Sequence, residues 1–168
     1  MRAIICMAVL LALAGCGYRS LGSGEVSALQ PSVKTISIGI LKNRTLRPTI
    51  HPALKDALIR RFATDGRIRV VEAGGDVLLD GTIEGFGEDA LAFSSSDQAK
   101  RVRLSISFSF TVKNGLEDKV LLRDGVAGVA YYFTGSGVTS TRSAEDEATL
   151  RAVADLADQV VSRVLDGV

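Results

Sequence analysis

Several residue types that build catalytic and nucleic-acid sites are scarce in this sequence. It contains two cysteines and one histidine, and its 20 lysines and arginines nearly balance 19 aspartates and glutamates. A strongly basic face is typical of nucleic-acid binding, so the balanced charge argues against that class of partner. No G-x-S-x-G segment occurs, and the single histidine, His51, adjoins Pro52 and is interpreted as the start of a helix. Beyond residue 15, no apolar run approaches the about 20 residues that a membrane-spanning helix needs.

The first sixteen residues have the layout of a secretory signal. A positive start precedes an unbroken apolar run over residues 4–13, and two small residues follow before Cys16. The segment LAGC, residues 13–16, resembles the bacterial lipobox. That resemblance implies cleavage before Cys16, a diacylglycerol on its thiol and acylation of the new amino terminus, and several acyl chains give stable anchoring. An ordinary signal peptide that happens to end near a cysteine is the alternative.

The processed chain would have little with which to build a reactive site. Removal of residues 1–15 takes away Cys6 and Arg2, so the lysine and arginine total falls from 20 to 19 and equals the acidic total. Lipid would consume Cys16, and one histidine without a free thiol cannot form a typical zinc site. We therefore expect no enzymatic activity, no metal and no cofactor. The acidic residues interpreted as solvated charges are Glu72, Asp76, Asp80 and Glu84.

Alternation of apolar and polar residues predicts strands over residues 33–41, 67–72, 77–87, 101–113 and 120–133. The apolar side of the first would hold Val33, Ile36, Ile38 and Ile40. In the strand over 101–113, every even-numbered residue is apolar and every odd-numbered one is polar, which indicates one dry and one wet face. Asn114-Gly115 predicts a hairpin turn, and Asp124-Gly125 predicts a bend or bulge. Residues 88–99 and 134–142 are expected to be loops.

Two helices complete the predicted fold. The first spans residues 52–65, carries Leu54, Leu58 and Phe62 on one stripe, and ends at Gly66. The second begins at Ser143, which with Asp146 resembles a capping box. Its stripe would comprise Val153, Leu156, Ala157, Val160 and Val164. We expect an α/β (α+β) two-layer sandwich: a mostly antiparallel four- to five-stranded sheet with both helices packed on one face. Residues 16–30 would form a tether between the lipid and a single domain over residues 31–168.

Two groups of basic residues are candidates for binding anionic lipid. One lies in a turn and the other at the start of the longest alternating strand. Arginine matches phosphate geometry with two hydrogen bonds, and lysine adds a point charge. Taken alone, either group is better explained as a solvated surface, and it is the expected lipid anchor that favours anionic lipid as a ligand. The groups are Lys42, Arg44 and Arg47, and Lys100, Arg101 and Arg103.

The order and spacing of several segments resemble the LptE family of lipopolysaccharide-assembly lipoproteins. These segments are CGY at residues 16–18, ISIGILKNRTLRP at 36–48, the helix stripe at 54–62, DGRIRVVE at 65–72 and GDVLLDGTIEGF at 75–86. The resemblance implies a two-helix, four-stranded α/β sandwich that sits as a plug inside the LptD β-barrel. There it would help the barrel to assemble and take part in placing lipopolysaccharide in the outer leaflet. The short first segment and the ALAFSSS loop depart from the family.

Localisation and partners follow from this resemblance. Gly17 follows the cysteine, where an aspartate tends to hold lipoproteins at the inner membrane, so we expect the outer membrane on its periplasmic side. The expected partners are an LptD-like barrel, lipopolysaccharide and the membrane through the lipid at Cys16. Arg101 and Arg103, with Lys100 near them, are the expected lipopolysaccharide-binding residues. The alternatives are an activator of a peptidoglycan synthase, an assembly factor for a secretin, or a periplasmic enzyme built around His51.

Overall fold

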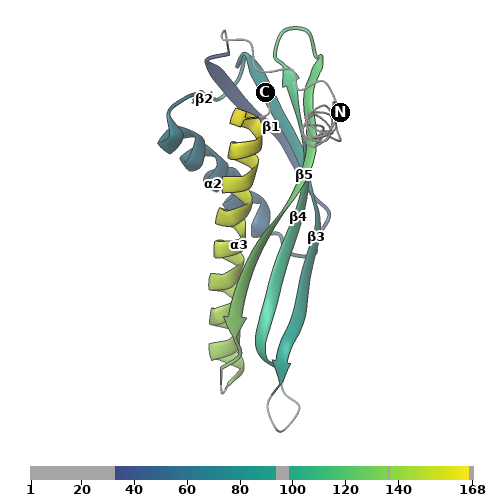
Figure 1. The fold of residues 1–168 in the computed structure, drawn as a ribbon, viewed down its shortest axis with the longest axis vertical. Helices are drawn as coiled ribbons and strands as arrows, with labels where there is room; N and C mark the ends of the chain where they lie inside the picture. Colours follow the sequence, from purple (N-terminus) through teal and green to yellow (C-terminus); the bar gives the residue numbers. More distant parts are fainter. Residues whose placement is uncertain (1–32, 94–98, 136, 167–168) are drawn as a thin grey trace, which may run out of the picture.

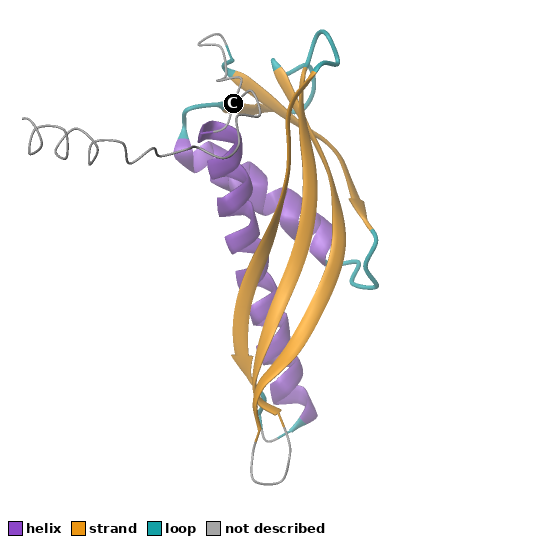
Figure 2. Ribbon diagram, turned by 45° about the vertical axis from the view of Figure 1, so that its right-hand side comes forward, coloured by secondary structure: helices purple, strands orange, loops and turns teal. Residues whose placement is uncertain are grey.

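The computed structural model describes residues 33–93, 99–135 and 137–166. Its elements follow the order β1 (Thr35–Asn43), α2 (Ile50–Asp65), β2 (Arg69–Val71), β3 (Val77–Phe93), β4 (Ala99–Asn114), β5 (Val120–Phe133) and α3 (Val138–Asp166). Both helices lie on one side of a long, twisted sheet (Figures 1 and 2). The predicted two-layer α+β class is therefore confirmed.

The five strands form one sheet in the order β2-β1-β3-β4-β5. The large β3–β4–β5 part is antiparallel, as expected, because short connections join these consecutive strands. β1 instead runs parallel to both β2 and β3. The crossover through α2 returns the chain to the end of the sheet at which β1 began, so the sheet is mixed.

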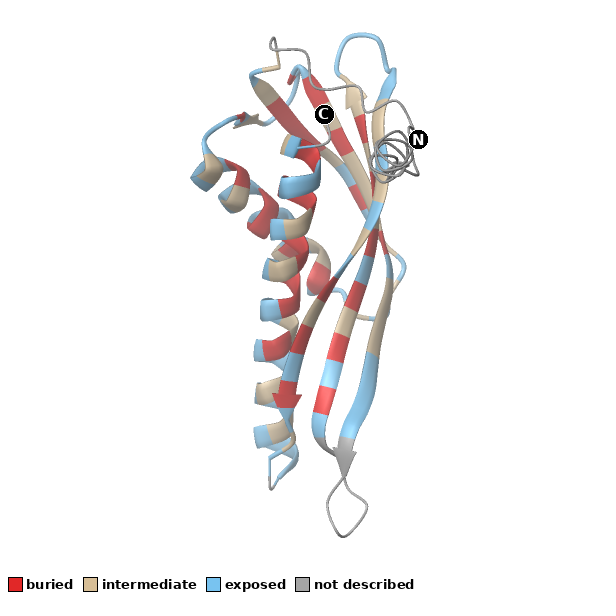
Figure 3. Cartoon of the chain, in the orientation of Figure 1, coloured by how far each residue is buried: buried red, intermediate tan, exposed pale blue. Residues whose placement is uncertain are grey.

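The inner face of the sheet and the two helices enclose a single apolar core. All six even-numbered residues from Val102 to Val112 in β4 are buried, so the predicted alternation is confirmed. The predicted stripes of both helices are buried as well, and Figure 3 shows buried positions recurring along both helices and along the strands. Gly66 ends α2 in a left-handed conformation, with its N–H donating to the Phe62 carbonyl at 3.1 Å.

Two predicted loops were partly wrong. β3 continues to Phe93 and β4 begins at Ala99, so much of the expected 88–99 loop is strand. The antiparallel ladder simply extends further, with register shifts after Ala90. The final helix begins at Val138 and not at Ser143, which lies inside it. The Ser140 hydroxyl and the Gly137 backbone hydrogen-bond to each other at the start of this helix and satisfy groups that the first turn leaves unpaired.

Two strand details were also wrong. Ile40 is 67% exposed, because a register irregularity between Ile38 and Leu41 turns it outward and buries Leu41 instead. The bulge expected at Asp124-Gly125 is absent from the described β4–β5 ladder, which runs in unbroken register there. Its irregularity lies near Val112, beside the hairpin turn.

Helix α3 also covers part of the free edge of β5. Polar side chains four residues apart on the helix reach backbone groups two residues apart on the strand. The Val129 N–H donates to Asp155 at 2.8 Å, and Gln159 donates to the Ala127 carbonyl at 3.0 Å. An uncovered strand edge invites pairing with another chain, and these contacts protect it over this stretch. Higher in Figure 1, β5 twists away from α3.

Candidate functional site

The outer face of the sheet, which turns away from both helices, is lined by short polar side chains. Along β4 these are Ser105, Ser107 and Ser109, and none of the residues paired with them on β3 and β5 is larger than valine. Gly85 and Gly87 stand opposite Ser107 and Ser105, so the face stays low across the middle of the sheet. Longer side chains rise above this surface in two places, at the end of the β3–β4 hairpin and over the middle of the sheet.

The first place is the tip cluster, which consists of Arg101, Arg103, Tyr131 and Phe133. The β4–β5 register sets Arg101 opposite Phe133 and Arg103 opposite Tyr131. All four are exposed on the outer face, and the Arg101 guanidinium carbon lies 4.8 Å from the centre of the Tyr131 ring. This geometry gives a cation–π contact that holds one arginine over an aromatic surface. The cluster can therefore offer a ligand both charge-assisted hydrogen bonds and apolar contact.

The tip cluster contains two of the three basic residues expected there and two aromatic residues that were not expected. Lys100 belongs to β4, but its side chain lies outside the described residues. Phe133 is 68% exposed and Tyr131 is 44% exposed, which is unusual for large rings. The Asn114-Gly115 turn does not predict this pairing, because the β4–β5 register shifts between Val112 and Lys113, so no local pattern indicated the two rings beside the arginines. Asp89 of β3 stands opposite Arg103 and lowers the net charge of the cluster.

The other predicted basic group is divided by the structure. Arg44 forms an ion pair with Glu84 at 2.8 Å on the outer face. Arg47 turns to the helix side, where it contacts Glu145 at 2.5 Å and lies 4.6 Å from the Phe86 ring centre. Lys42 alone faces the middle of the outer surface. The three residues therefore do not form one site.

Arg47 belongs to a cluster of polar side chains on the helix side of the sheet. The Tyr132 hydroxyl donates to Glu88 at 2.7 Å, and Glu88 lies 3.8 Å from Arg47. Burial, reinforced by the Glu88 carboxylate, raises the pKa of the Tyr132 hydroxyl well above its usual range. Because Arg47 also pairs with Glu145 of α3, this polar cluster connects the segment between β1 and α2 to the final helix. We assign it a structural role.

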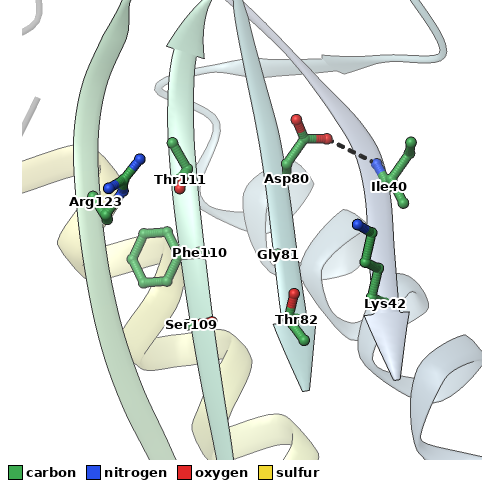
Figure 4. Close-up of a pocket in the computed structure, with 9 residues that line it drawn as sticks. All are labelled: Ile40, Lys42, Asp80, Gly81, Thr82, Ser109, Phe110, Thr111 and Arg123. Atoms are coloured by element: carbon green, nitrogen blue, oxygen red, sulfur yellow. Dashed lines mark hydrogen bonds between the residues drawn. The ribbon is translucent and has the colours of Figure 1, made fainter. Parts of the chain in front are cut away.

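The second place is the hydroxyl hollow, a depression of about 370 Å³ over the middle of the outer face. Figure 4 shows Lys42 of β1 on one side and Arg123 of β5 on the other, with hydroxyl side chains of β3 and β4 between them. Asp80 accepts a hydrogen bond from the Ile40 N–H at 2.9 Å at one end. No local sequence pattern indicates this hollow, because its two cations are brought together only by the order and register of four strands.

Other features bear on the predicted chemistry. His51 is half-buried in the first turn of α2. No group of three histidine, cysteine, aspartate or glutamate side chains is placed to hold a metal within the part of the chain that the structure describes. Neither described helix is both long and apolar enough to cross a membrane. Cys16 lies outside the described residues.

The chain is similar to known proteins at two levels. A family model described as LptE, lipopolysaccharide-assembly, matches residues 33–164. No curated protein matches the sequence.

Several solved structures share the fold. The rare lipoprotein B of Shewanella oneidensis is 10% identical with a TM-score of 0.56, covering 77% of this chain and 94% of its own. The uncharacterized lipoprotein B of Nitrosomonas europaea is 15% identical with a TM-score of 0.58, covering 86% and 88%. The hypothetical protein CT253 of Chlamydia trachomatis is 10% identical with a TM-score of 0.59, covering 81% and 98%. At these identities the likeness shows a shared fold.

Proposed function

The chain belongs to the LptE family of lipopolysaccharide-assembly proteins, and from this premise we propose that it is an outer-membrane lipoprotein that forms a complex with an LptD-like β-barrel. In that complex it would act as plug and assembly factor and help to place lipopolysaccharide in the outer leaflet. The observation that carries the proposal is the family match over nearly the whole described region, residues 33–164. Residues 1–15 would be the signal peptide, 16–30 the lipidated tether and 31–168 the working domain.

The outer face of the sheet supports a role inside a polar enclosure. The interiors of large outer-membrane barrels are polar and hydrated, so a protein seated there needs a polar surface. Ser105, Ser107 and Ser109 provide short hydroxyl groups on the outer face, while the apolar residues of the same strand are buried under the helices. Such a surface can contact a polar wall without exposing apolar area.

Capture of the native complex tests the proposed partner. The full chain, tagged at its C-terminus, is purified from detergent-solubilised membranes after crosslinking, and its partners are identified by mass spectrometry. We expect a large β-barrel protein as the main crosslinked partner. Recovery of a peptidoglycan synthase or a secretin in its place would refute the barrel proposal and favour one of the alternatives.

The anchor is tested by the change Cys16→Ala. The variant should appear as an unacylated precursor or as a product that no longer fractionates with membranes, because the thiol that carries the diacylglycerol is gone. Incorporation of a palmitate analogue measures acylation directly. Unchanged labelling and membrane fractionation in the variant would rule out Cys16 as the anchor.

The tip cluster is the proposed lipopolysaccharide contact. Arg101 and Arg103 would hydrogen-bond to headgroup phosphates, while the Tyr131 and Phe133 rings would lie against its apolar parts. Charge reversal of both arginines should weaken lipopolysaccharide binding by the purified protein about tenfold or more, since hydrogen bonds to charged groups contribute roughly 1.5–3 kcal/mol each. The melting temperature should stay unchanged because both side chains are exposed. Unchanged binding in this double variant, with the barrel still captured, would disprove the contact alone.

A further inference from the structure

We propose that the hydroxyl hollow is a second binding site, separate from the tip cluster, and that its ligand is an acidic saccharide: a sugar that carries a phosphate or carboxylate. The hollow comprises Lys42, Asp80, Thr82, Ser109, Thr111 and Arg123, with Ile40 at its rim. Along β4, Ser109 lies six residues from Arg103, which is about 20 Å at the rise of a strand. One monosaccharide therefore cannot contact both places.

The pairing of the four strands places the side chains of the hollow in two adjacent rows that run across the sheet. In one row Lys42 pairs with Thr82, Thr82 with Ser109, and Ser109 with Gly125. Gly125 has no side chain, so this row is open on the β5 side. The Lys42 chain rises at the opposite end and closes it there.

The second row has the reverse arrangement. Asp80 pairs with Thr111, and Thr111 pairs with Arg123, so the long cationic side chain rises on the β5 side. Lys42 and Arg123 thus stand at diagonally opposite corners, over three interstrand spacings of about 4.8 Å each. A ligand that lies between them would contact a cation at each end and the threonine and serine hydroxyls beneath it.

The charges of the hollow favour an anion at its corners. Neither Lys42 nor Arg123 forms an ion pair with a carboxylate of the described residues, although many of the other basic side chains do. Glu84, which accepts a hydrogen bond from the Ser109 hydroxyl at 2.7 Å, is also engaged by Arg44 at 2.8 Å. These contacts pull the pKa of Glu84 below its usual range, so it stays charged and paired. The two unpaired cations exceed the single remaining acid, Asp80.

The floor of the hollow favours a sugar over a bare inorganic anion. Thr82 and Thr111 supply hydroxyls that can donate or accept, and one oxygen of Asp80 holds the Ile40 N–H, which leaves the other to accept from a ligand hydroxyl. The Asp80 carboxylate at one end of the hollow repels a free phosphate but accepts hydrogen bonds from a polyol. The exposed Ile40 side chain gives an apolar wall for a ring face. The volume of about 370 Å³ is within the usual range of small-ligand sites.

The test is a titration of the isotope-labelled full chain in detergent micelles, followed by backbone amide shifts. Glucose 6-phosphate should shift the amides of Thr82, Ser109 and Thr111 with saturation, at concentrations at least tenfold below those needed for glucose or inorganic phosphate. The double change Lys42→Ala and Arg123→Ala should raise the required concentration at least tenfold. Lys55→Ala with Arg60→Ala is the matched control, because it removes the same charge from exposed positions on α2.

Several results would overturn the proposal. These are the absence of saturating shifts at the hollow, equal effects of glucose and glucose 6-phosphate, and equal affinity in the Lys42/Arg123 variant with its melting temperature retained. Stronger binding of an oligoglutamate peptide than of glucose 6-phosphate at the same amides would assign the hollow to a protein partner and would also overturn it.

Two further measurements identify the source of the saccharide. If the hollow binds the sugar part of lipopolysaccharide, the Lys42/Arg123 variant also retains less lipopolysaccharide; if it binds a soluble sugar phosphate, lipopolysaccharide retention is unchanged. Both results support the site and differ only in the ligand's origin. Charge reversal at Arg101 and Arg103 should leave the glucose 6-phosphate shifts intact, so failure of the tip contact and failure of the hollow are separate outcomes.

Discussion

The two faces of β4 carry alternate residues of one strand, yet they differ in almost every physical property. On the inner face, Phe108 and Phe110 stack with ring centres 6.0 Å apart, and each is almost completely buried. On the outer face, Ser107 and Ser109 are short, polar and uncovered by the helices. The inner face contributes stability through close packing, whereas the outer face contributes little stability and is free to contact other molecules.

Glycine shows the same difference on the neighbouring strand. A Cβ atom on Gly128, which faces α3, would collide with the Ala152 carbonyl oxygen and come within 2.9 Å of the Leu156 nitrogen. A Cβ atom on Gly125, which faces outward, would have nothing nearer than the Phe108 carbonyl oxygen at 3.7 Å. On the inner face, the absence of a side chain at Gly128 lets α3 pack closely on the sheet. On the outer face, the absence of a side chain at Gly125 leaves an open surface.

The largest expected effect is the difference in stability between the variants Phe108→Ala and Ser107→Ala. The Phe108 ring is 1% exposed and lies directly over Gly81, so Phe108→Ala leaves a cavity that the glycine cannot fill. It should lower the free energy of unfolding by about 3–5 kcal/mol. Ser107→Ala should change it by less than about 0.5 kcal/mol. Urea unfolding measures both, and equal losses would show that the two faces of β4 do not differ as described.

A smaller difference in stability is expected between alanine variants of Gly128 and Gly125 in β5. Gly128→Ala forces α3 away from the sheet at a backbone contact, and overpacking of this kind costs about 1–3 kcal/mol. Gly125→Ala should be neutral or stabilising by up to about 1 kcal/mol, because it reduces the freedom of the unfolded chain without a clash.

Thermal unfolding of the two glycine variants gives the comparison directly. The inner-face variant should melt clearly below the natural chain, and the outer-face variant at or above it. If Gly125→Ala proved the more damaging change, the assignment of faces along β5 would be wrong.

The smallest effect concerns Asp76, which directly precedes β3 and contacts the start of β1. Its carboxylate accepts hydrogen bonds from the Lys34 and Thr35 N–H groups, both at 2.9 Å, and from the Thr35 hydroxyl at 2.8 Å. These bonds lower the pKa of Asp76 below its usual range. The stabilisation is therefore present above the pKa of an unfolded aspartate, about 4, and is lost as pH falls through the lower folded value.

Asp76→Asn tests this pH dependence. The variant should be slightly less stable than the natural chain at pH 7, and the difference should shrink between about pH 4 and pH 2. Asp56→Asn, at an exposed position of α2, serves as the control for the loss of one charge. A stability difference for Asp76→Asn that does not vary with pH would contradict the role given to its carboxylate.

The errors of prediction have physical causes that are visible in particular residues. The polar and small residues after Glu88 gave no clear alternation, yet pairing with β4 carries β3 on to Phe93, since ladder hydrogen bonds do not depend on side-chain pattern. The glycine, serine and threonine residues before Ser143 predicted a loop, because these residues are weak helix formers. Contacts of Ser140 with Gly137 nevertheless start the helix earlier.

The sequence alone determined the features that depend on near neighbours in the chain. These are the two faces of β4, the buried stripes of both helices and the left-handed end of α2 at Gly66. Tertiary structure decided what depends on pairing between distant strands: the outward turn of Ile40, the place of Tyr131 beside Arg101, and the position of Lys42 across from Arg123. Periodicity fixes which way a side chain points, because it repeats every two or 3.6 residues. Which side chains from other strands stand beside it is fixed by register and strand order, which local pattern does not encode.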